Sequence, residues 1–307
     1  MEDGAWRPQR PVVLIAGTPS GGGQDRAARA LAASMGSHLG VMIEVVNVPG
    51  RGGGNGWDRL AGAPGDSHLL SISSPTLITN RLVGAAEIDH LSLTALALLC
   101  TEHLAFAVAD GSSITDGSDL IARLLSKEGL VTSFATAIGN MNHIALARLA
   151  AHAGGSAASL QTRVFDSAPE AVTDLVIGNS DLAVVSAASV VNEVEKGLVR
   201  LVAVSSPVRL EGPLRLAPTW DEMGVPCTIG TWRGVVAPPG LTSEPIEFWE
   251  QAILAATAVG EWKAALDRHK WTPSVLGAEA TRAFHVEQSD LLSVALTDLG
   301  LVAAARG

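Results

Sequence analysis

The chain has 307 residues, of which 47% are hydrophobic and 17% charged, so it is long enough to form two lobes with sizeable cores. The formal net charge of −10, without any cluster of Lys and Arg, excludes a general nucleic-acid-binding surface. No apolar run approaches the roughly 20 residues that a membrane-spanning helix needs.

The first residues, MEDGAWRPQRP, lack the basic and apolar regions of a secretion signal. Two interpretations stay open: a leader has been removed from an exported domain, or the protein is cytoplasmic. The polar lead-in with Trp and Pro is typical of the start of a mature exported domain. It favours removal of a leader.

Strands and helices alternate along the first third of the chain. An apolar strand over residues 11–16 precedes a helix over 24–39, whose buried side repeats every three to four residues. The pattern then predicts a strand over 41–47, a short helix around 57–60 and a strand over 68–73. Strands that are apolar throughout and separated by helices indicate a parallel sheet covered on both faces.

The remaining two thirds continue this alternation. We expect strands over residues 104–108, 130–135, 181–186, 198–205 and 231–238. We expect helices over residues 116–126, 142–151, 169–177 and 188–196, a helix opened by LTSEPIEFW (241–249), and a final helix over 278–299. The sequence contains no repeat and no long linker, so the fold class is α/β.

The stretch GTPSGGGQD (residues 17–25) joins the first strand to the first helix, and it does not fit a nucleotide site. A phosphate-binding loop of the Walker type places Lys after its last glycine, where this chain has Gln24. A dinucleotide site has G-x-G-x-x-G and an acidic residue after the second strand, where this chain has Asn47. No cofactor is therefore expected.

Ser20 is the candidate nucleophile of the same stretch. A nucleophile elbow has the pattern G-x-S-x-G, and Thr18 stands where the first glycine belongs. His143, His68 and downstream aspartates have no spacing that supports a triad. We therefore expect no catalytic residue.

Anion binding without chemistry fits the stretch better. The first N–H groups of a helix are unpaired and lie at the positive end of its dipole. Gly21, Gly22 and Gly23 let the backbone approach a ligand, and Asp25 would cap N–H groups rather than touch an anion. A single glycine would indicate only a tight turn, but a second glycine-rich loop at residues 50–56 favours a site.

Residues 10–56, RPVVLIAGTPSGGGQDRAARALAASMGSHLGVMIEVVNVPGRGGGNG, resemble the opening of the tripartite tricarboxylate transporter receptors, also called the Bug family. The family pattern is a strand, P-G-G-x-x-D, a helix containing A-R, and a strand ending in V-x-N-x-P-G-x-G-G. Further segments such as FATAIGNMNHIALARLA, KGLVRLVAVSS and TWRGVVAPPGLTSEPIEFW extend the resemblance over nearly the whole chain.

The resemblance implies a periplasmic solute receptor with no catalytic residues. Its fold would be like the type II periplasmic binding proteins, with two α/β lobes around a ligand cleft joined by hinge strands. Lobe 1 would comprise residues 8–102 and 230–307, and lobe 2 residues 103–229. The receptor, a monomer, would bind a di-, tri- or aromatic carboxylate and deliver it to a membrane permease. A cytoplasmic enzyme or metabolite sensor on the same fold is the alternative.

The resemblance also carries over a set of ligand-binding positions. The expected ligand-binding residues are Ser20, Gly21, Gly22, Gly23, Asp25, Ser73, Ser74, Ile138, Gly139, Asn140, Met141, Asn142, His143, Ser167 and Ser186. For His143, a role in capping or packing is an equal alternative to ligand contact. Ser20 replaces the family's proline, and Met141 stands where a small residue is usual, so the identity of the ligand stays open.

Cys100 and Cys227 are the two cysteines, and they fit no metal-binding spacing. As single cysteines they are typical small buried hydrophobes. The resemblance places one near the first crossing between the lobes and the other near the return. A disulfide between them is therefore an alternative in an exported protein.

Overall fold

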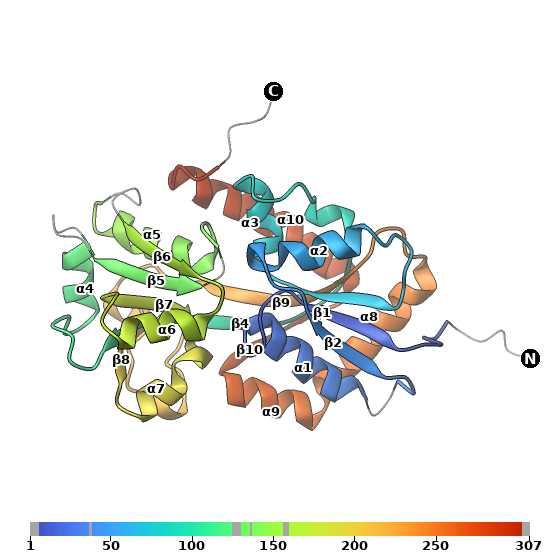
Figure 1. Cartoon of the computed structure of the whole chain (residues 1–307), viewed down its shortest axis with the longest axis horizontal. Coiled ribbons are helices and arrows are strands. Elements are labelled where there is room, and N and C mark those ends of the chain that lie inside the picture. Colours follow the sequence, from blue (N-terminus) through green and yellow to red (C-terminus); the bar gives the residue numbers. More distant parts are fainter. Residues whose placement is uncertain (1–5, 37–38, 125–129, 136, 156–159, 303–307) are drawn as a thin grey trace, which may run out of the picture. The chain divides into compact units, whose positions relative to one another are not determined.

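The computed structural model describes residues 6–36, 39–124, 130–135, 137–155 and 160–302 (Figure 1). The ends of two predicted helices, at residues 37–38 and 125–126, lie outside the described residues. Contacts between residues divide the chain into two compact units. Unit 1 contains residues 1–101 and 232–292, and unit 2 contains residues 102–231 and 293–307.

Unit 1 is built on short apolar strands that alternate with helices. Its strands are β1 (Val12–Ala16), β2 (Ile43–Asn47), β3 (Leu69–Ser73) and β10 (Trp271–Leu276), with the first part of β4 (Thr94–Ala109) and most of β9 (Gly230–Ala237). Its helices are α1 (Gly23–Gly36), α2 (Gly54–Ala61), α3 (Thr76–Leu82), α8 (Ser243–Ala258), α9 (Gly260–His269) and most of α10 (Ala278–Asp298).

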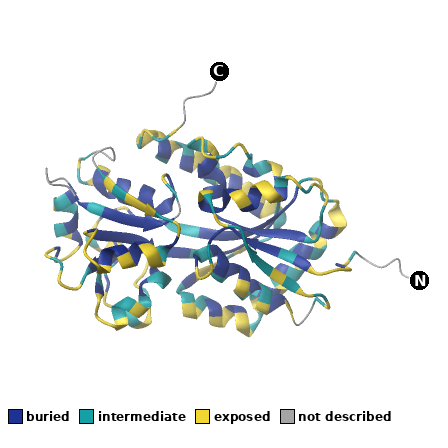
Figure 2. Cartoon of the chain, in the orientation of Figure 1, coloured by how far each residue is buried: buried dark blue, intermediate teal, exposed yellow. Residues whose placement is uncertain are grey.

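Helices cover both faces of the unit 1 strands, as the apolar character of those strands predicts. Val12 and Leu14 of β1 pack into a cluster with Trp249, while Ile15 of the same strand packs into a second cluster with Trp57. Successive side chains of a strand point to opposite faces, so these two clusters lie on the two sides of the strand. In Figure 2 most residues of β1 and β3 are dark blue, and the outer faces of the helices carry exposed residues.

Unit 2 repeats the alternation of strands and helices. Its strands are β5 (Val131–Ala135), β6 (Gln161–Phe165), β7 (Leu182–Ser186) and β8 (Val199–Val204), together with the second part of β4. Its helices are α4 (Gly117–Leu124), α5 (Met141–His152), α6 (Ala168–Val176) and α7 (Val191–Glu195). One buried cluster joins Leu175 of α6 to Ala107 of β4 and Val185 of β7.

The parallel sheet predicted from the first third of the chain is confirmed, and the later strands add antiparallel pairs. β1 pairs in parallel with β2 and β3, and β5 pairs in parallel with β6 and β7. β9 runs antiparallel to β3, and β4 runs antiparallel to β7 and β8. β4 and β9 are the strands within which the chain passes from one unit to the other. These two strands are therefore antiparallel to their neighbours, which βα connections make parallel to one another.

Candidate functional site

The turn before α1 carries the three consecutive glycines. Gly21 has a φ of +81°, a left-handed conformation that favours glycine, and its N–H donates to Asp25 Oδ2 at 2.8 Å. The N–H of Gly22 donates to the Pro19 carbonyl at 3.0 Å, which closes the turn. A Cβ on Gly22 would lie 2.5 Å from Thr18 Oγ1, so a side chain there would push the turn apart.

Asp25 holds this turn in place from the first turn of α1. It is 2% exposed and also accepts hydrogen bonds from Asn47 Nδ2 at 2.8 Å and Arg29 Nε at 3.0 Å. Burial acts to raise the pKa of Asp25, but the hydrogen bonds from Arg29, the Gly21 N–H and Asn47 together lower it below the ordinary carboxyl value. Asp25 therefore stays ionised and is fully engaged in the scaffold.

Three N–H groups of the turn remain for a ligand. Within the described residues, the backbone N–H groups of Ser20, Gly23 and Gln24 have no hydrogen-bond partner. Those of Gly23 and Gln24 belong to the first turn of a 14-residue helix, where the helix dipole favours negative charge. The geometry suits a carboxylate or another small anion.

The second glycine-rich loop packs against the first. A Cβ on Gly17 would lie 2.4 Å from the Cα of Gly53, so the two backbones touch. The Gln24 side chain joins them, because its Oε1 accepts from the Gly17 N–H at 2.9 Å and its Nε2 donates to the Gly52 carbonyl at 3.2 Å. The glycines at 52 and 53 thus serve close packing. Gln24 is the supporting residue of the candidate site that the sequence analysis missed, and its place directly after three glycines is the signal that could have found it.

Ser73, the last residue of β3, and Ser74, which follows it, have different surroundings. Ser74 Oγ lies 2.6 Å from Thr76 Oγ1, which donates to the Gly52 carbonyl at 2.9 Å, and a longer contact of 3.5 Å reaches Gln24. Ser74 therefore belongs to the same network as the turn before α1. Ser73 Oγ is buried and has no hydrogen-bond partner within the described residues.

In unit 2 a comparable turn opens α5. Gly139 has a φ of +79°, and its N–H donates to His143 Nδ1 at 3.1 Å. Asn140 is the N-cap residue, and its side-chain oxygen accepts from the His143 N–H at 3.0 Å. Ile138, 42% exposed, lies at the rim of this turn.

His143 supports the turn. Its ring stacks on Phe134 with centroids 5.4 Å apart, and burial lowers its pKa below the ordinary value. A neutral ring can accept from the Gly139 N–H at Nδ1, which is the bond found here. The structure thus gives His143 the capping and packing role that the sequence analysis left open beside ligand contact.

The amide side chain of Asn142 is also part of the scaffold, since Nδ2 donates to the Val184 carbonyl of β7 at 2.8 Å. The backbone N–H groups of Met141 and Asn142, by contrast, have no partner in the part of the chain that the structure describes. The Met141 side chain is buried, at 7% exposure. The start of α5 therefore offers two N–H groups beside an apolar side chain.

Of the last two predicted serines, Ser167 has a hydrogen-bonded hydroxyl and Ser186 does not. Ser167 is the N-cap residue of α6, but its hydroxyl donates to Glu170 Oε1 at 2.8 Å. A carboxylate of the chain thus already lies beside the start of that helix. Ser186 ends β7, and its buried hydroxyl oxygen has no partner among the described residues.

Cys100 and Cys227 are both buried and form no disulfide, so the interpretation as small buried hydrophobes is confirmed and the alternative of a disulfide is contradicted. Cys100 packs in the core of unit 1. Cys227 belongs to unit 2, where its Sγ lies 3.8 Å from the Ala145 carbonyl of α5. Burial raises the pKa of Cys227 to about 12, so this thiol stays protonated.

The described residues show neither a metal-binding cluster nor a membrane-spanning helix. They contain no group of three or more His, Cys, Asp or Glu side chains placed to hold a metal ion. They also contain no helix with the length and apolar character that crossing a membrane requires.

Comparison with solved structures shows a shared α/β fold. An R. palustris protein solved with adipate superimposes with a TM-score of 0.87 at 22% identity, covering 96% of this chain and 99% of that one. MatC of Rhodopseudomonas palustris with bound malate has a TM-score of 0.78 at 22% identity, covering 96% and 100%. The periplasmic binding protein BugD has a TM-score of 0.84 at 23% identity, covering 96% and 99%.

Sequence comparison adds the family. A curated relative, the UPF0065 protein in the tcbD-tcbE intergenic region of Pseudomonas sp. strain P51, is 30% identical over 264 residues, which are 84% of this chain and 77% of the relative. Residues 27–301 match the model of the tripartite tricarboxylate transporter family receptor. The chain therefore belongs to the tripartite tricarboxylate transporter receptor family.

Proposed function

We propose that the chain is a periplasmic receptor that binds a small organic carboxylate and delivers it, unchanged, to the membrane permease of a tripartite transporter. It acts as a monomer and catalyses no reaction. The proposal depends most on one observation, the unpartnered N–H groups of Gly23 and Gln24 at the start of α1. Membership of the receptor family and the malate and adipate bound by two structural neighbours support it.

The turn before α1 is suited to reversible capture. Its conformation is held by Asp25 and Gln24 through bonds within the chain, so the N–H groups are in place before a ligand arrives. Such preorganisation reduces the entropy lost on binding. The turn before α5 has the same property, with Asn140 and His143 as its supports. We propose that each turn binds a carboxylate group of the solute.

The amides of Gly23 and Gln24 recognise a carboxylate group rather than a whole molecule. We therefore propose di-, tri- or aromatic carboxylates as the class of ligand. Calorimetric titration with adipate, malate, citrate and benzoate shows which of these acids the protein binds. We expect the folded protein to bind at least one of these acids. Failure of all four, with the protein folded, would contradict the proposal.

The same titration tests the site. Gly22→Val places its side chain against Thr18 and pushes the turn apart, so we expect binding to weaken at least about tenfold, the loss of one to two charge-assisted hydrogen bonds. Gly260→Val is the matched control, because a Cβ on Gly260 meets nothing within 4 Å. Equal affinity in the two variants would show that the turn before α1 is not the site.

A further inference from the structure

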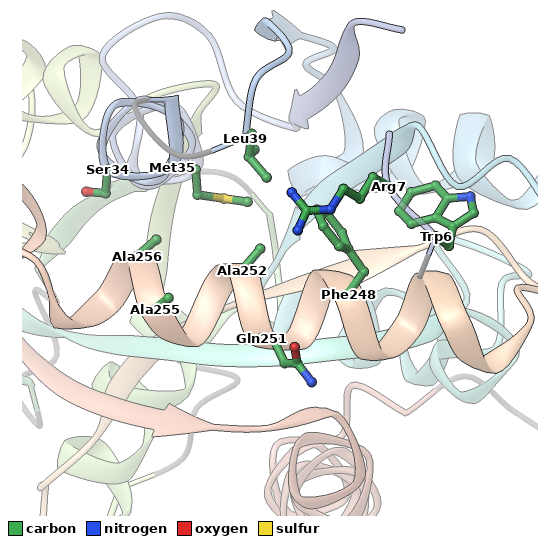
Figure 3. Close-up of a pocket in the computed structure, with 10 residues that line it drawn as sticks. All are labelled: Trp6, Arg7, Ser34, Met35, Leu39, Phe248, Gln251, Ala252, Ala255 and Ala256. Carbon is green, nitrogen blue, oxygen red and sulfur yellow. The ribbon is translucent and has the colours of Figure 1, made fainter. Parts of the chain in front are cut away.

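A cavity of about 330 Å³ lies in unit 1, between the end of α1, the middle of α8 and the segment before β1 (Figure 3). It exists because α8 carries alanines at 252, 255 and 256 on the side that faces Met35 of α1. The same helix fills its neighbouring core positions with the fully buried Trp249 and Ile253. The volume is near the lower end of the range for ligand pockets, which indicates a small occupant.

Contacts within the chain hold the aromatic side chains of the cavity wall in place. The Trp6 ring makes edge contacts with Phe248 at 5.3 Å, with Trp249 at 6.0 Å and with His68 at 5.6 Å between centroids. Trp249 is itself held by a hydrogen bond from its indole N–H to the Ser67 carbonyl at 2.8 Å. The cavity therefore has an aromatic wall that does not need a ligand to form.

A charged side chain faces this cavity. Arg7 is the one ionisable residue among the described residues of the lining, and Figure 3 shows its guanidinium directed over the cavity beside Phe248. No ion pair of Arg7 is found among the described residues. Arg10, three residues later, binds Asp66 at 2.7 Å. Among the described residues that line the cavity there is no Asp or Glu, although the whole chain has a net charge of −10.

We propose that this cavity is a second binding site, separate from the turn before α1, for a small monocarboxylate with an aromatic or aliphatic body. The carboxylate pairs with the guanidinium of Arg7, and the apolar body lies between Trp6, Phe248 and Met35. A mostly apolar lining with a few polar groups, here Arg7, Ser34 and Gln251, is the usual composition of a small-molecule site. A neutral apolar compound would gain nothing from the exposed guanidinium of Arg7, and a second carboxylate would lie against the apolar wall of Trp6 and Phe248 without a partner.

The test uses 2-naphthoate as the probe and the indole N–H resonance of Trp6 as the readout, with the resonance assigned through Trp6→Phe. We expect naphthoate to shift this resonance in a saturable way. Ala252→Leu fills the cavity and should weaken naphthoate binding at this site more than tenfold. Arg7→Gln should weaken it about fivefold, the effect of losing one partly exposed ion pair. Arg10→Gln, in the same segment but outside the cavity, is the matched control and should leave it unchanged.

Two further arms separate this site from the proposed carboxylate site. Gly22→Val should keep the naphthoate-dependent shift of Trp6, whether or not the turn before α1 binds a solute. The neutral analogue 2-naphthalenemethanol should bind at least about fivefold more weakly than naphthoate, since it cannot pair with Arg7. A Trp6 resonance that does not respond to naphthoate, or a response that survives Ala252→Leu, would overturn the proposal.

Discussion

The turns before α1 and α5 present free backbone N–H groups in similar ways but are supported by different chemistry. In unit 1 an ionised carboxylate, Asp25, holds the Gly21 N–H. In unit 2 two neutral groups do the corresponding work, the Asn140 amide and the His143 ring. The comparison shows that the N–H groups, and not the side chains around them, are the common feature. Because one support is charged and the other is neutral, we expect the two turns to respond differently to mutation and to acid.

The largest effect is expected where the charged support is removed. Asp25→Asn replaces an oxygen that accepts hydrogen bonds with an NH₂ group that cannot, next to Asn47 and Arg29. We expect the free energy of unfolding to fall by about 2 kcal/mol, as measured by urea denaturation. The value is moderated by the exposure of Arg29, whose side chain is 53% exposed.

Asp119→Asn is the matched control for this variant. Asp119 forms the same i,i+4 pair with Arg123, but on the surface of α4. Surface pairs contribute little to stability, so the loss should be clearly smaller than for Asp25→Asn. Equal losses in the two variants would show that Asp25 is an ordinary surface partner and does not hold the turn.

The neutral support in unit 2 should cost less to remove. Asn140→Ala deletes the side-chain acceptor of the His143 N–H, and loss of an N-cap side chain costs about 1 kcal/mol. Thermal unfolding measures the difference. Thr242→Ala is the control, because Thr242 is the N-cap residue of α8 but makes no capping hydrogen bond. A larger loss for Thr242→Ala would contradict this assignment.

The two supports should also respond to acid in different pH windows. Burial lowers the pKa of His143, so the unfolded chain takes up a proton there before the folded chain does. Stability therefore falls as pH drops below about 6.5, and His143→Gln, which keeps an acceptor, should reduce that fall between pH 6.5 and 5. The lowered pKa of Asp25 acts in the same direction but in a lower pH window, because it stabilises the fold at neutral pH and that contribution is lost only below about pH 4.

Urea denaturation across the pH range measures both windows. Asp25→Asn should leave the slope between pH 6.5 and 5 unchanged and flatten the slope below pH 4. His143→Gln should flatten the slope between pH 6.5 and 5 and leave the slope below pH 4 unchanged. An unchanged slope in both variants would mean that neither support titrates in the assigned way.

The smallest effects are expected for the buried hydroxyls that have no partner. Ser73→Ala and Ser186→Ala remove oxygen atoms that make no hydrogen bond within the described residues, so stability should change by less than about 0.5 kcal/mol. Ser74→Ala breaks a bonded network and should cost about 1 kcal/mol. If either unpartnered hydroxyl binds the solute, its alanine variant will lose affinity without losing stability.

Most elements of the fold could be predicted from the sequence, and the exceptions have physical reasons. α3 lacks a capping signal, since Pro75 is its N-cap residue and makes no side-chain hydrogen bond. β6 has a largely polar sequence, Gln161–Phe165, and no residue of it is fully buried. β4 begins ten residues before the predicted strand, because an apolar run by itself does not show where a strand starts.

The glycines of the turn before α1 could be predicted because a helix N-terminus places its free N–H groups at a known position. The contacts of Gln24 could not, because they join residues 28 and 50 positions apart in the chain. Those contacts depend on two loops meeting backbone to backbone at Gly17 and Gly53. Side-chain networks of this kind arise only from the tertiary fold.

The meeting of Gly17 and Gly53 has a consequence for mutational scanning. Substitution at either position forces the two loops apart, and Gly56, where a Cβ would lie 2.8 Å from Ile15, should be equally intolerant. In a growth-based scan these three positions would score as strictly as residues that touch the transported acid. Ser20 is exposed and would tolerate many replacements, and under the function proposed above it is the position where a replacement should change which acid is preferred. Ser20 is therefore the position at which to engineer selectivity among acids.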